Sequence, residues 1–507
     1  FIAINIIDII YIFQVYHSYL FLLSLLVGMA SHWFYLAVIV IVSAYFMTID
    51  ECPFSSTPAR SIEQVVEKLE NQAQTNLPVS LHRAAVGYNT NLDLACNGVE
   101  LLNTLGVDPS SLGALRPAEI IKTLDDFGRS FAYFFQQGSA AERAAKDTEI
   151  WDSITQPLIA SDFEGCQVLP GGNAALISNR LAALNVSVLL GGPVGNVLED
   201  LLHSSITTMR KFHEQSSTDP FPEVTDEIHL IMEFSTGDEW GSITSPRANR
   251  FIISHDMQNS HLSVMEDFHG TITSYNPEVI IIAGSHLLES LESEERSVRL
   301  QNLVSALSSV PSHIAVHLEI AGVGDIQFLE GMARSLFPLV DSIGLNEQEL
   351  GMLYLATGGT QYQGDDFVTP TAQVAADAIQ HLMDLEYVAT GNGKHEISRV
   401  HLHYLSFHMI GQKISPSSGV FNWDKQKAAR AVAAGSLATS IQACGEDGKL
   451  PPTSELHIKE YGTDDLFASF KTHSMEYWVA PVAVCNVPKR TVGLGDCISA
   501  TGISYHF

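Results

Sequence analysis

The stretch Arg490-Thr-Val-Gly493-Leu-Gly495-Asp496-Cys-Ile-Ser-Ala500 decides the fold of this chain. An apolar run at 482–485 precedes it and is typical of a buried strand, while the small residues after Asp496 predict a helix. Glycines at 493 and 495 let the backbone approach an anion closely. The helix start then directs free amides and the positive end of its dipole toward that anion. The segment therefore predicts a strand, an anion-binding turn and a helix, as in an α/β protein.

The aspartate in this turn has a specific chemical use. Asp496 can accept a proton from a substrate hydroxyl while the amides at Gly493 and Gly495 form an anion hole for a transferring phosphoryl group. The alternative is an ordinary glycine turn in which Asp496 caps the helix. The preceding Arg490-Thr491 and the helix of small residues favour the functional interpretation.

Two acidic motifs occur at the ends of other strand-like runs. His317-Leu-Glu319 lies within one run, and Asn346-Glu-Gln-Glu349 follows another. Hard oxygen ligands at the carboxyl ends of parallel strands are suited to Mg²⁺ beside a nucleotide. Helix capping is the plain alternative for the second motif. Together with the glycine turn, the two motifs predict a metal–phosphate site.

Amide and glycine residues supply groups suited to a polyol. Asn91 and Asp93 share one side of an extended chain and offer both donors and acceptors. Gly172-Asn173 opens a predicted helix, where the amide can bond a sugar hydroxyl. An Asx turn explains the first pair equally well, and tight strand–helix packing explains the glycines.

Four further residues have a functional and a plain interpretation. Glu142 is either a ligand of the polyol or a surface helix acid. Arg250 stands out because the chain has only 27 Lys and Arg, and it serves either a phosphate or a surface salt bridge. His286 and His403 follow or lie in apolar strands, where histidine is usually a satisfied core residue.

The hydrophobic pattern predicts an α/β architecture. Short apolar runs alternate with helical patterns, which favours a mainly parallel sheet covered by helices on both faces. The expected strands are 186–190, 279–283, 314–320, 342–345 and 482–485, and the expected helices are 174–184, 424–444 and 497–504. Segments 227–234 and 250–254 have strand character without a helix between them and suggest a lid, whereas 358–371 and 445–474 are polar surface loops.

Charge and composition exclude some functions. The formal net charge is −30, which argues against a nucleic-acid partner because such proteins neutralise phosphates with Lys and Arg. Hydrophobic residues make up 46% of the chain, which suits a well-filled core rather than disorder.

The first 47 residues contain no Lys or Arg and are almost wholly apolar. They predict a membrane segment with one span, two being possible, because the apolar run exceeds the ~20 residues that one span needs. We expect 48–80 to be a tether leading into the body and 81–507 to be the catalytic domain, with lid strands within about 88–175 and 227–256.

The six cysteines have no C-x-x-C spacing, so a zinc ribbon is not expected. We interpret them as buried thiols. A Cys444–Cys485 bridge is the alternative, in an oxidising compartment.

Taken together, these segments resemble the eukaryotic ADP-dependent glucokinases of the ribokinase-like superfamily. The resemblance runs from about Asn91 to the C-terminus. The matching stretches, in the family's order, are GSAAER (138–143), PGGNAALI (170–177), GGPVG (191–195), ANRFIISHD (248–256), HLE (317–319), SIGLNEQEL (342–350), RVHLHYLSFH (399–408) and RTVGLGD (490–496). The leader is longer and more hydrophobic than is usual in the family, and 445–474 is shorter.

The resemblance implies a large α/β domain, a small lid, and transfer of the β-phosphoryl group of ADP to the 6-hydroxyl of glucose. The products are AMP and glucose 6-phosphate, at the start of glycolysis. It implies Asp496 as the base, with Glu319, Glu349 and Asp496 around one Mg²⁺ ion, some of them through water. It also implies glucose contacts for Asn91, Asp93, Glu142, Gly172 and Asn173, and phosphate or nucleotide contacts for Arg250, His286 and His403. We further expect a monomer, anchored at the endoplasmic reticulum membrane or, if the leader is cleaved, in the secretory pathway.

Two alternatives stay open at this point. An ATP-dependent sugar kinase of the same superfamily would carry much the same turn and acidic motifs. A catalytically silent sugar- or nucleotide-binding protein on a membrane is less compatible with Asp496, Glu319 and Glu349, because binding alone needs no base.

Overall fold

The computed structural model describes residues 61–507 except 119, 140, 146, 161–164, 217–220, 223, 391–392, 460–465, 487 and 490–491. All of this belongs to the second of two compact units, Ser61–Phe507. The predicted membrane segment, residues 48–60 of the predicted tether, and Arg490-Thr491 lie outside the described residues. Within those described ranges, none of the helices has both the length and the apolar character that a bilayer span requires.

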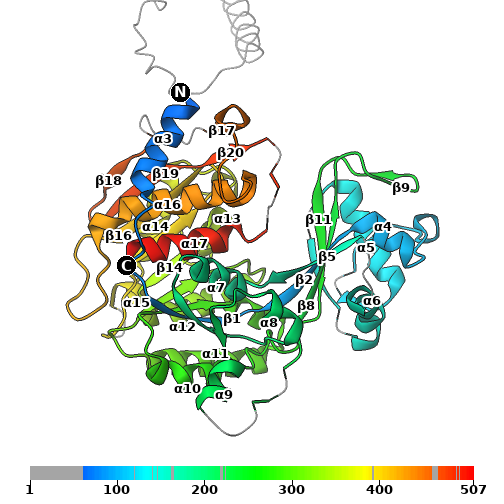
Figure 1. Ribbon diagram of the computed structural model, residues 1–507, viewed down its shortest axis with the longest axis horizontal. Coiled ribbons are helices and arrows are strands. Elements are labelled where there is room, and N and C mark those ends of the chain that lie inside the picture. The colour runs from blue at the N-terminus through cyan, green and yellow to red at the C-terminus, as the bar shows by residue number, and fades with distance from the viewer. Residues whose placement is uncertain are drawn as a thin grey trace, which may run out of the picture. The chain divides into compact units, whose positions relative to one another are not determined.

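A ten-stranded sheet forms the framework of the body (Figure 1). Its order is β18-β19-β16-β15-β14-β13-β12-β1-β6-β7. The strands from β7 to β15 are parallel, and β16, β19 and β18 continue the sheet antiparallel. The bounds, in chain order, are β1 Arg83–Tyr88, β6 Ser187–Gly191, β7 Ile206–Thr208, β12 Val279–Ala283, β13 Ala315–Glu319, β14 Ser342–Asn346, β15 Arg399–His403, β16 Phe407–Lys413, β18 Ser469–Lys471 and β19 Met475–Pro481.

Helices cover both faces of this sheet, as the continuous apolar strands require. In β12, Ile280 and Ile282 enter one core cluster while Val279 and Ile281 enter another. The first cluster includes residues of α10 (Met265–Tyr275), α11 (Ser293–Ser308) and α12 (Ile326–Leu336). The second includes residues of α7 (Asn173–Ala183) and α17 (Leu494–His506), and α16 (Lys425–Cys444) lies beside α17 (Figure 1).

A separate six-stranded sheet has the order β3-β4-β11-β8-β2-β5 and mixed direction. Its strands are β2 Asn91–Asn97, β3 Ile120–Ile121, β4 Ala141–Ala145, β5 Cys166–Gly171, β8 Ile228–Phe234 and β11 Asn249–Ser254. Helices α4 (Gly98–Thr104), α5 (Leu124–Gln137) and α6 (Thr148–Ala160) pack on it. Phe131 of α5 centres this core, with its ring against Phe234, Trp240 and Phe251. The chain passes directly from β1 to β2, so the two sheets meet at Asn89-Thr90.

The remaining α-helices and β-strands lie outside the groups described so far. They are α3 Ile62–Ala73, α8 Asn196–Leu201, α9 Met209–Ser216, α13 Glu347–Ala356, α14 Ala372–Asp384, α15 Glu386–Thr390, β9 Glu239–Trp240, β10 Ile243–Thr244, β17 Leu456–Ile458 and β20 Ala483–Cys485. Ser61 caps α3, whose Leu69 and Ala73 are buried against α16.

The prediction of a mainly parallel sheet is confirmed, with β16, β19 and β18 continuing it antiparallel. Two other sequence predictions need correction. The run 482–485 is not a strand of the large sheet: β20 pairs only with β17 in a two-stranded sheet. The last helix begins at Leu494 rather than Cys497, so Asp496 lies inside its first turn.

The cysteines differ from the predicted buried thiols. Cys96 and Cys166 face each other across β2 and β5 and form a disulfide. Cys444 and Cys485 form a second one, with their Cα atoms 5.8 Å apart. Cys497 is buried and free. The preferred thiol interpretation was therefore wrong for both pairs.

Candidate active site

Most of the predicted site residues line one cleft of 740 Å³ between strand ends of the two sheets. Asn91 and Asp93 come from β2, Gly172 and Asn173 from the start of α7, and Asp496 from the start of α17. The predicted residues that line this cleft are Asn91, Asp93, Glu142, Gly172, Asn173, His286, Gly493 and Asp496. Arg250, Glu319, Glu349, His403 and Gly495 are not part of its lining.

Asp496 is a buried acid in the first turn of α17. The N-cap of this helix is Gly493, whose φ of 71° lies in the left-handed region, and no side chain caps the helix. The interpretation of Asp496 as an ordinary N-cap is therefore excluded. Burial, and then the charge of Glu319, raise the pKa of Asp496 to about 7. An acid with this pKa can take up a proton near neutral pH, which a general base must do.

Two adjacent glycines make room for the polar groups of β2. A Cβ at Gly171 would lie 2.2 Å from Oδ1 of Asp93, and one at Gly172 would lie 2.8 Å from Oδ1 of Asn91. The Asn91 amide donates to Asp93 over 2.7 Å. Asn89, which the sequence analysis did not select, donates to the Asn173 side chain over 3.3 Å. The glycines thus serve tight packing and a polar cleft at the same time.

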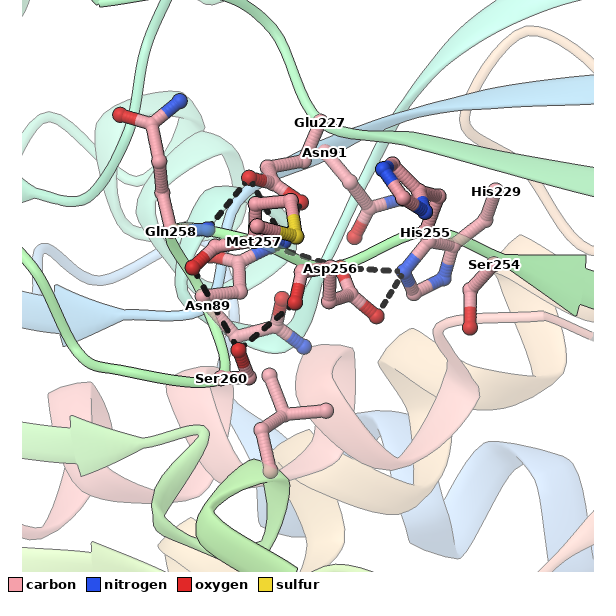
Figure 2. A network of polar contacts seen from close by, with 12 residues as sticks. Asn89, Asn91, Glu227, His229, Ser254, His255, Asp256, Met257, Gln258 and Ser260 are labelled. Carbon is pink, nitrogen blue, oxygen red and sulfur yellow. Dashed lines mark hydrogen bonds and ion pairs between the residues drawn. The ribbon is translucent and has the colours of Figure 1, made fainter. Parts of the chain in front are cut away.

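Figure 2 shows a second polar network in this cleft, which sequence reasoning missed. His229 on β8 lies 3.0 Å from both carboxylate oxygens of Asp256. Burial alone would lower the pKa of His229, but the charge and hydrogen bond of Asp256, with the charges of Glu142 and Asp93, raise it to about 10. At neutral pH, His229 is therefore a charged imidazolium beside the carboxylates of the cleft. The only sequence signals were a histidine within the strand 227–234 and the His-Asp pair that follows β11.

The same network reaches the connection between the sheets. Asn259 donates to Asp256 over 3.2 Å and to the carbonyl oxygen of Thr90 over 3.0 Å, and it accepts from the Thr90 amide. Glu227 accepts from the amides of Met257 and Gln258. Burial and then the charge of Asp256 raise the pKa of Glu227 to about 7. The site is thus built onto the segments that join the two sheets.

Arg250 and Glu142 occupy neighbouring strands of the smaller sheet. Ser254 donates to Glu142 over 3.3 Å, which directs this carboxylate into the cleft lining. Arg250 is half-buried on β11 opposite Glu233 of β8. Burial lowers the pKa of His286 to about 4, so this lining residue is neutral at pH 7.

A second pocket of 540 Å³ adjoins the other side of the glycine turn. Asn346, Glu347, His403 and Gly495 line it. Gly493 faces the first cleft and Gly495 the second, so the turn 493–496 lies between two hollows. This arrangement can place an acceptor on one side of an anion-binding turn and a donor on the other.

The two predicted acidic motifs lie near this turn. Burial would raise the pKa of Glu319, but hydrogen bonds from His317 and His403 lower it to about 2. Glu349 forms the capping box of α13 with Asn346, which confirms the plain interpretation of that motif. Burial still raises the pKa of Glu349 to about 8.

These carboxylates fit a metal that is held mainly through water. Among the described residues, no three His, Cys, Asp or Glu side chains converge into a ready-made metal site. Burial and then the charge of Glu319 raise the pKa of both Glu349 and Asp496, so ionising these acids together is unfavourable unless a cation is bound among them. Mg²⁺ typically keeps several waters and binds one or two carboxylates together with nucleotide phosphates. The donor chemistry therefore suits Mg²⁺, without a preformed cage.

Comparisons with known proteins identify a matching family and several similar proteins. Residues 82–505 match the family described as ADP-specific phosphofructokinase/glucokinase conserved region. An ADP-dependent glucokinase of Bos taurus is 33% identical, covering 83% of this chain and 84% of the relative. A probable ADP-dependent glucokinase of Caenorhabditis elegans is 30% identical, covering 83% and 85%. A phosphofructokinase structure from Pyrococcus horikoshii with AMP is 18% identical, has a TM-score of 0.65 and covers 85% of this chain and 98% of its own, which confirms the α/β fold.

Proposed function

Because this chain belongs to the ADP-specific phosphofructokinase/glucokinase family, we propose that it is an ADP-dependent glucokinase. It transfers the β-phosphoryl group of ADP to the 6-hydroxyl of glucose and releases AMP and glucose 6-phosphate. The observation that carries this proposal is the position of Asp496, a buried acid that lines the larger cleft in the same turn whose Gly495 lines the second pocket. Two relatives that are at least 30% identical to this chain bear the glucokinase name.

The charge of the cleft favours glucose over a sugar phosphate. The family also contains phosphofructokinases, which are 23–24% identical to this chain. Asp93, Glu142 and Asp256 line the cleft, along with Glu289, Glu292 and Glu295. Carboxylates repel a second phosphate and accept hydrogen bonds from neutral hydroxyls. A neutral hexose is therefore the better acceptor.

The mechanism follows from the geometry of the turn. Glucose binds against Asn91, Asp93, Glu142, Gly172 and Asn173, with its 6-hydroxyl toward Asp496. Asp496 accepts the hydroxyl proton as the new bond forms, while the amides at Gly493 and Gly495 stabilise the phosphoryl oxygens. Asn173, which donates to Asp496 over 2.9 Å, holds the acid in place.

Glu319 and Glu349 would hold one Mg²⁺ ion through water, with Asp496 at its edge. When bound, the ion neutralises charge on the phosphates of the nucleotide. We assign the nucleotide to the pocket beside Gly495, bordered by His403. Arg250 would meet a phosphate, and His286 would border the reacting groups from the larger cleft.

We assign the six-stranded sheet to a lid that closes over the sugar. Its strands fall within 91–171 and 228–254. Asn259 and Thr90, which are hydrogen-bonded to each other, lie in two of the segments that connect this sheet to the body. We assign the catalytic domain to 81–507, with α3 packed against its α16, and we propose that it acts as a monomer.

Two disulfides support a location in the secretory pathway, with the body on the oxidising side of the membrane. The apolar segment 1–47 is the proposed anchor. Protease protection of sealed microsomes tests this orientation. The body should be degraded only after detergent is added, and degradation in intact microsomes would refute it.

Coupled product formation tests the function. Glucose and fructose 6-phosphate should each be offered with ADP, ATP or GDP, always with Mg²⁺. We expect turnover with glucose and ADP. Preference for ATP would favour the ATP-dependent alternative, and preference for fructose 6-phosphate would favour the other branch of the family. Glucose binding without turnover would indicate a silent binding protein.

A further inference from the structure

Arg399 is a fully buried arginine that the mechanism above does not use. No ion pair joins it to a carboxylate in the described part of the chain, and its guanidinium meets only neutral groups: Ser342, His401 and His506. It also stacks on Trp423, 5.0 Å from the ring centroid. A buried charge without a direct counter-charge is costly, so its position requires an explanation.

The explanation is a row of cross-strand neighbours that leads from Arg399 to Glu319. His317, Ser342 and Arg399 are paired residues on the adjacent strands β13, β14 and β15. Arg399 donates to the Ser342 hydroxyl over 2.9 Å, and that hydroxyl lies 2.9 Å from Nδ1 of His317.

The far end of the row is the acidic motif of β13. Nε2 of His317 lies 3.0 Å from Oε2 of Glu319, two residues along on the same side of the strand. Gly344 leaves space for this contact, since a Cβ there would lie 2.2 Å from that oxygen. Arg399 and Glu319 are therefore joined through two side chains.

The direction of donation along this row is fixed by its ends. A guanidinium can only donate hydrogen bonds, and an ionised carboxylate can only accept them. Glu319 only accepts, so a neutral His317 carries its proton on Nε2 and donates it to Glu319. Nδ1 of that ring then accepts the proton of Ser342, whose oxygen accepts from Arg399.

Arg399 also reaches the helix that carries Asp496. Its Nε donates to Nδ1 of His506, near the end of α17, over 2.9 Å. One buried cation thus contacts the helix of the proposed base and, through the row, the proposed metal carboxylate.

We propose that Arg399 is a positioning residue for phosphoryl transfer: through Ser342 and His317 it orients Glu319 as an acceptor-only carboxylate toward the nucleotide site. The proposal rests on the proposed function for the role of Glu319. The hydrogen-bonded row itself is independent of that function. Partners of this kind, one step removed from a metal ligand, typically change metal affinity or activity about 10–100-fold when removed.

Ser342→Ala tests the row with little change in volume. Ser398→Ala is the matched control, because Ser398 is buried one residue before β15 and its hydroxyl has no partner among the described residues. Binding of Mn²⁺, alone and with ADP, is measured by electron paramagnetic resonance. The ¹⁵N shifts of His317 in histidine-labelled protein report which ring nitrogen is protonated. Turnover and the KM for glucose complete the set.

We expect the wild type to show His317 protonated at Nε2. Ser342→Ala should weaken Mn²⁺ binding and lower kcat by about tenfold each, with an unchanged glucose KM. Ser398→Ala should match the wild type. A proton on Nδ1 in the wild type, or equal behaviour of the two alanine variants, would overturn the proposal. If Ser342→Ala does not fold, Arg399→Lys replaces it and should shift the His317 signal, and an unshifted signal refutes the row. If the protein lacks ADP-dependent turnover, the proposed function fails, but the Mn²⁺ and ¹⁵N measurements still test the hydrogen-bonded row. Failure of the proposed function can therefore be distinguished from failure of the positioning role of Arg399.

Discussion

The side-chain amide of Asn173 donates to Oδ1 of Asp496 over 2.9 Å, and this bond joins the first turn of α7 to the first turn of α17. Two helix starts, more than 300 residues apart in sequence, thus converge on one acid. Both helices place the positive ends of their dipoles at this point, so an anion between them is attracted from two sides. The bond fixes the acid relative to segment 171–173, which we propose to contact the sugar.

Asp496→Asn should abolish most turnover while leaving the cleft intact. Asparagine keeps the size of the side chain but has no basic carboxylate, so the proton of the attacking hydroxyl loses its acceptor. We expect kcat to fall by at least about 10²-fold, the low end for loss of a general base. Glucose binding, measured by intrinsic fluorescence or calorimetry, should weaken much less.

Asp424→Asn is a suitable control for this change. Asp424 caps α16 at an exposed position, so the same carboxylate-to-amide replacement removes a charge outside the site. Its kcat should be close to that of the wild type. Near-normal turnover of Asp496→Asn would remove Asp496 from the role of base.

The ion pair between His229 and Asp256 should make the stability of the folded protein depend on pH. Asp256 raises the pKa of the buried His229 from 6.5 to about 10 against the effect of burial. A group whose pKa is raised on folding contributes stability that is fully present below pH 6.5 and is lost as the pH rises through about 10. Thermal unfolding of the ligand-free protein should therefore show a falling melting temperature across this window.

Asp256→Asn removes the partner and should flatten that part of the curve. Subtracting the variant from the wild type cancels the lysines and tyrosines that titrate in the same range. The difference in melting temperature should be largest near pH 6.5 and vanish toward pH 10. A difference that is constant with pH would mean that His229 is not charged in the folded protein.

Much of the fold was predictable because its signals are local. The strand 279–283 was predicted with the bounds that β12 has, since five buried apolar residues between polar neighbours admit few interpretations. The glycine turn at 493–496 was predictable for the same reason. The partner of β20 was not: 482–485 has the composition of a central strand, yet β19 takes the place in the sheet next to β16.

The residues of the site that sequence reasoning missed depend on long-range contacts. His229 and Asp256 are 27 residues apart and meet only because β8 and β11 pair antiparallel. Nothing in the strand pattern distinguishes His229 from a core histidine. The Cys96–Cys166 disulfide was missed for the same reason, because these two residues become neighbours only through the register of β2 with β5. Pairing across strands is therefore the information that local sequence lacks.

Glu349→Gln should cause a defect that Mg²⁺ can offset. Glutamine retains the capping box with Asn346, so α13 should still form. Glutamine cannot ionise, however, whereas Glu349 can lose its proton when a cation binds beside the proposed phosphate site. We expect a higher Mg²⁺ requirement, with turnover partly recovered at high Mg²⁺. A titration of initial rate against free Mg²⁺ measures this. A loss that no Mg²⁺ concentration reduces would place Glu349 outside metal binding.

The fragment 48–507 should be active without the apolar leader. Every described residue of the site lies beyond position 88, and the compact unit begins at Ser61. Its kcat should equal that of the full chain. Removal of residues 1–73 should instead lower the melting temperature, because it takes away α3 and exposes the α16 surface that Leu69 and Ala73 cover. Loss of turnover in a folded 48–507 fragment would show that the leader is more than a tether.

The disulfide between Cys444 and Cys485 should matter more to the nucleotide than the one between Cys96 and Cys166. Cys444 and Cys485 line the pocket beside Gly495 and join α16 to the segment just before the glycine turn. Cys96 and Cys166 join β2 and β5 at the opposite end from Asn91 and Gly171.

Each double serine variant should lose roughly 2–4 kcal/mol in free energy of unfolding, since the two bridges close loops of 70 and 41 residues. Only Cys444→Ser/Cys485→Ser should also raise the KM for ADP, because its turn segment is no longer held against α16. Denaturant unfolding and initial rates on both variants measure the two effects. An equal rise in the KM for ADP in both variants would show that loss of stability alone, and not the position of the turn, weakens nucleotide binding.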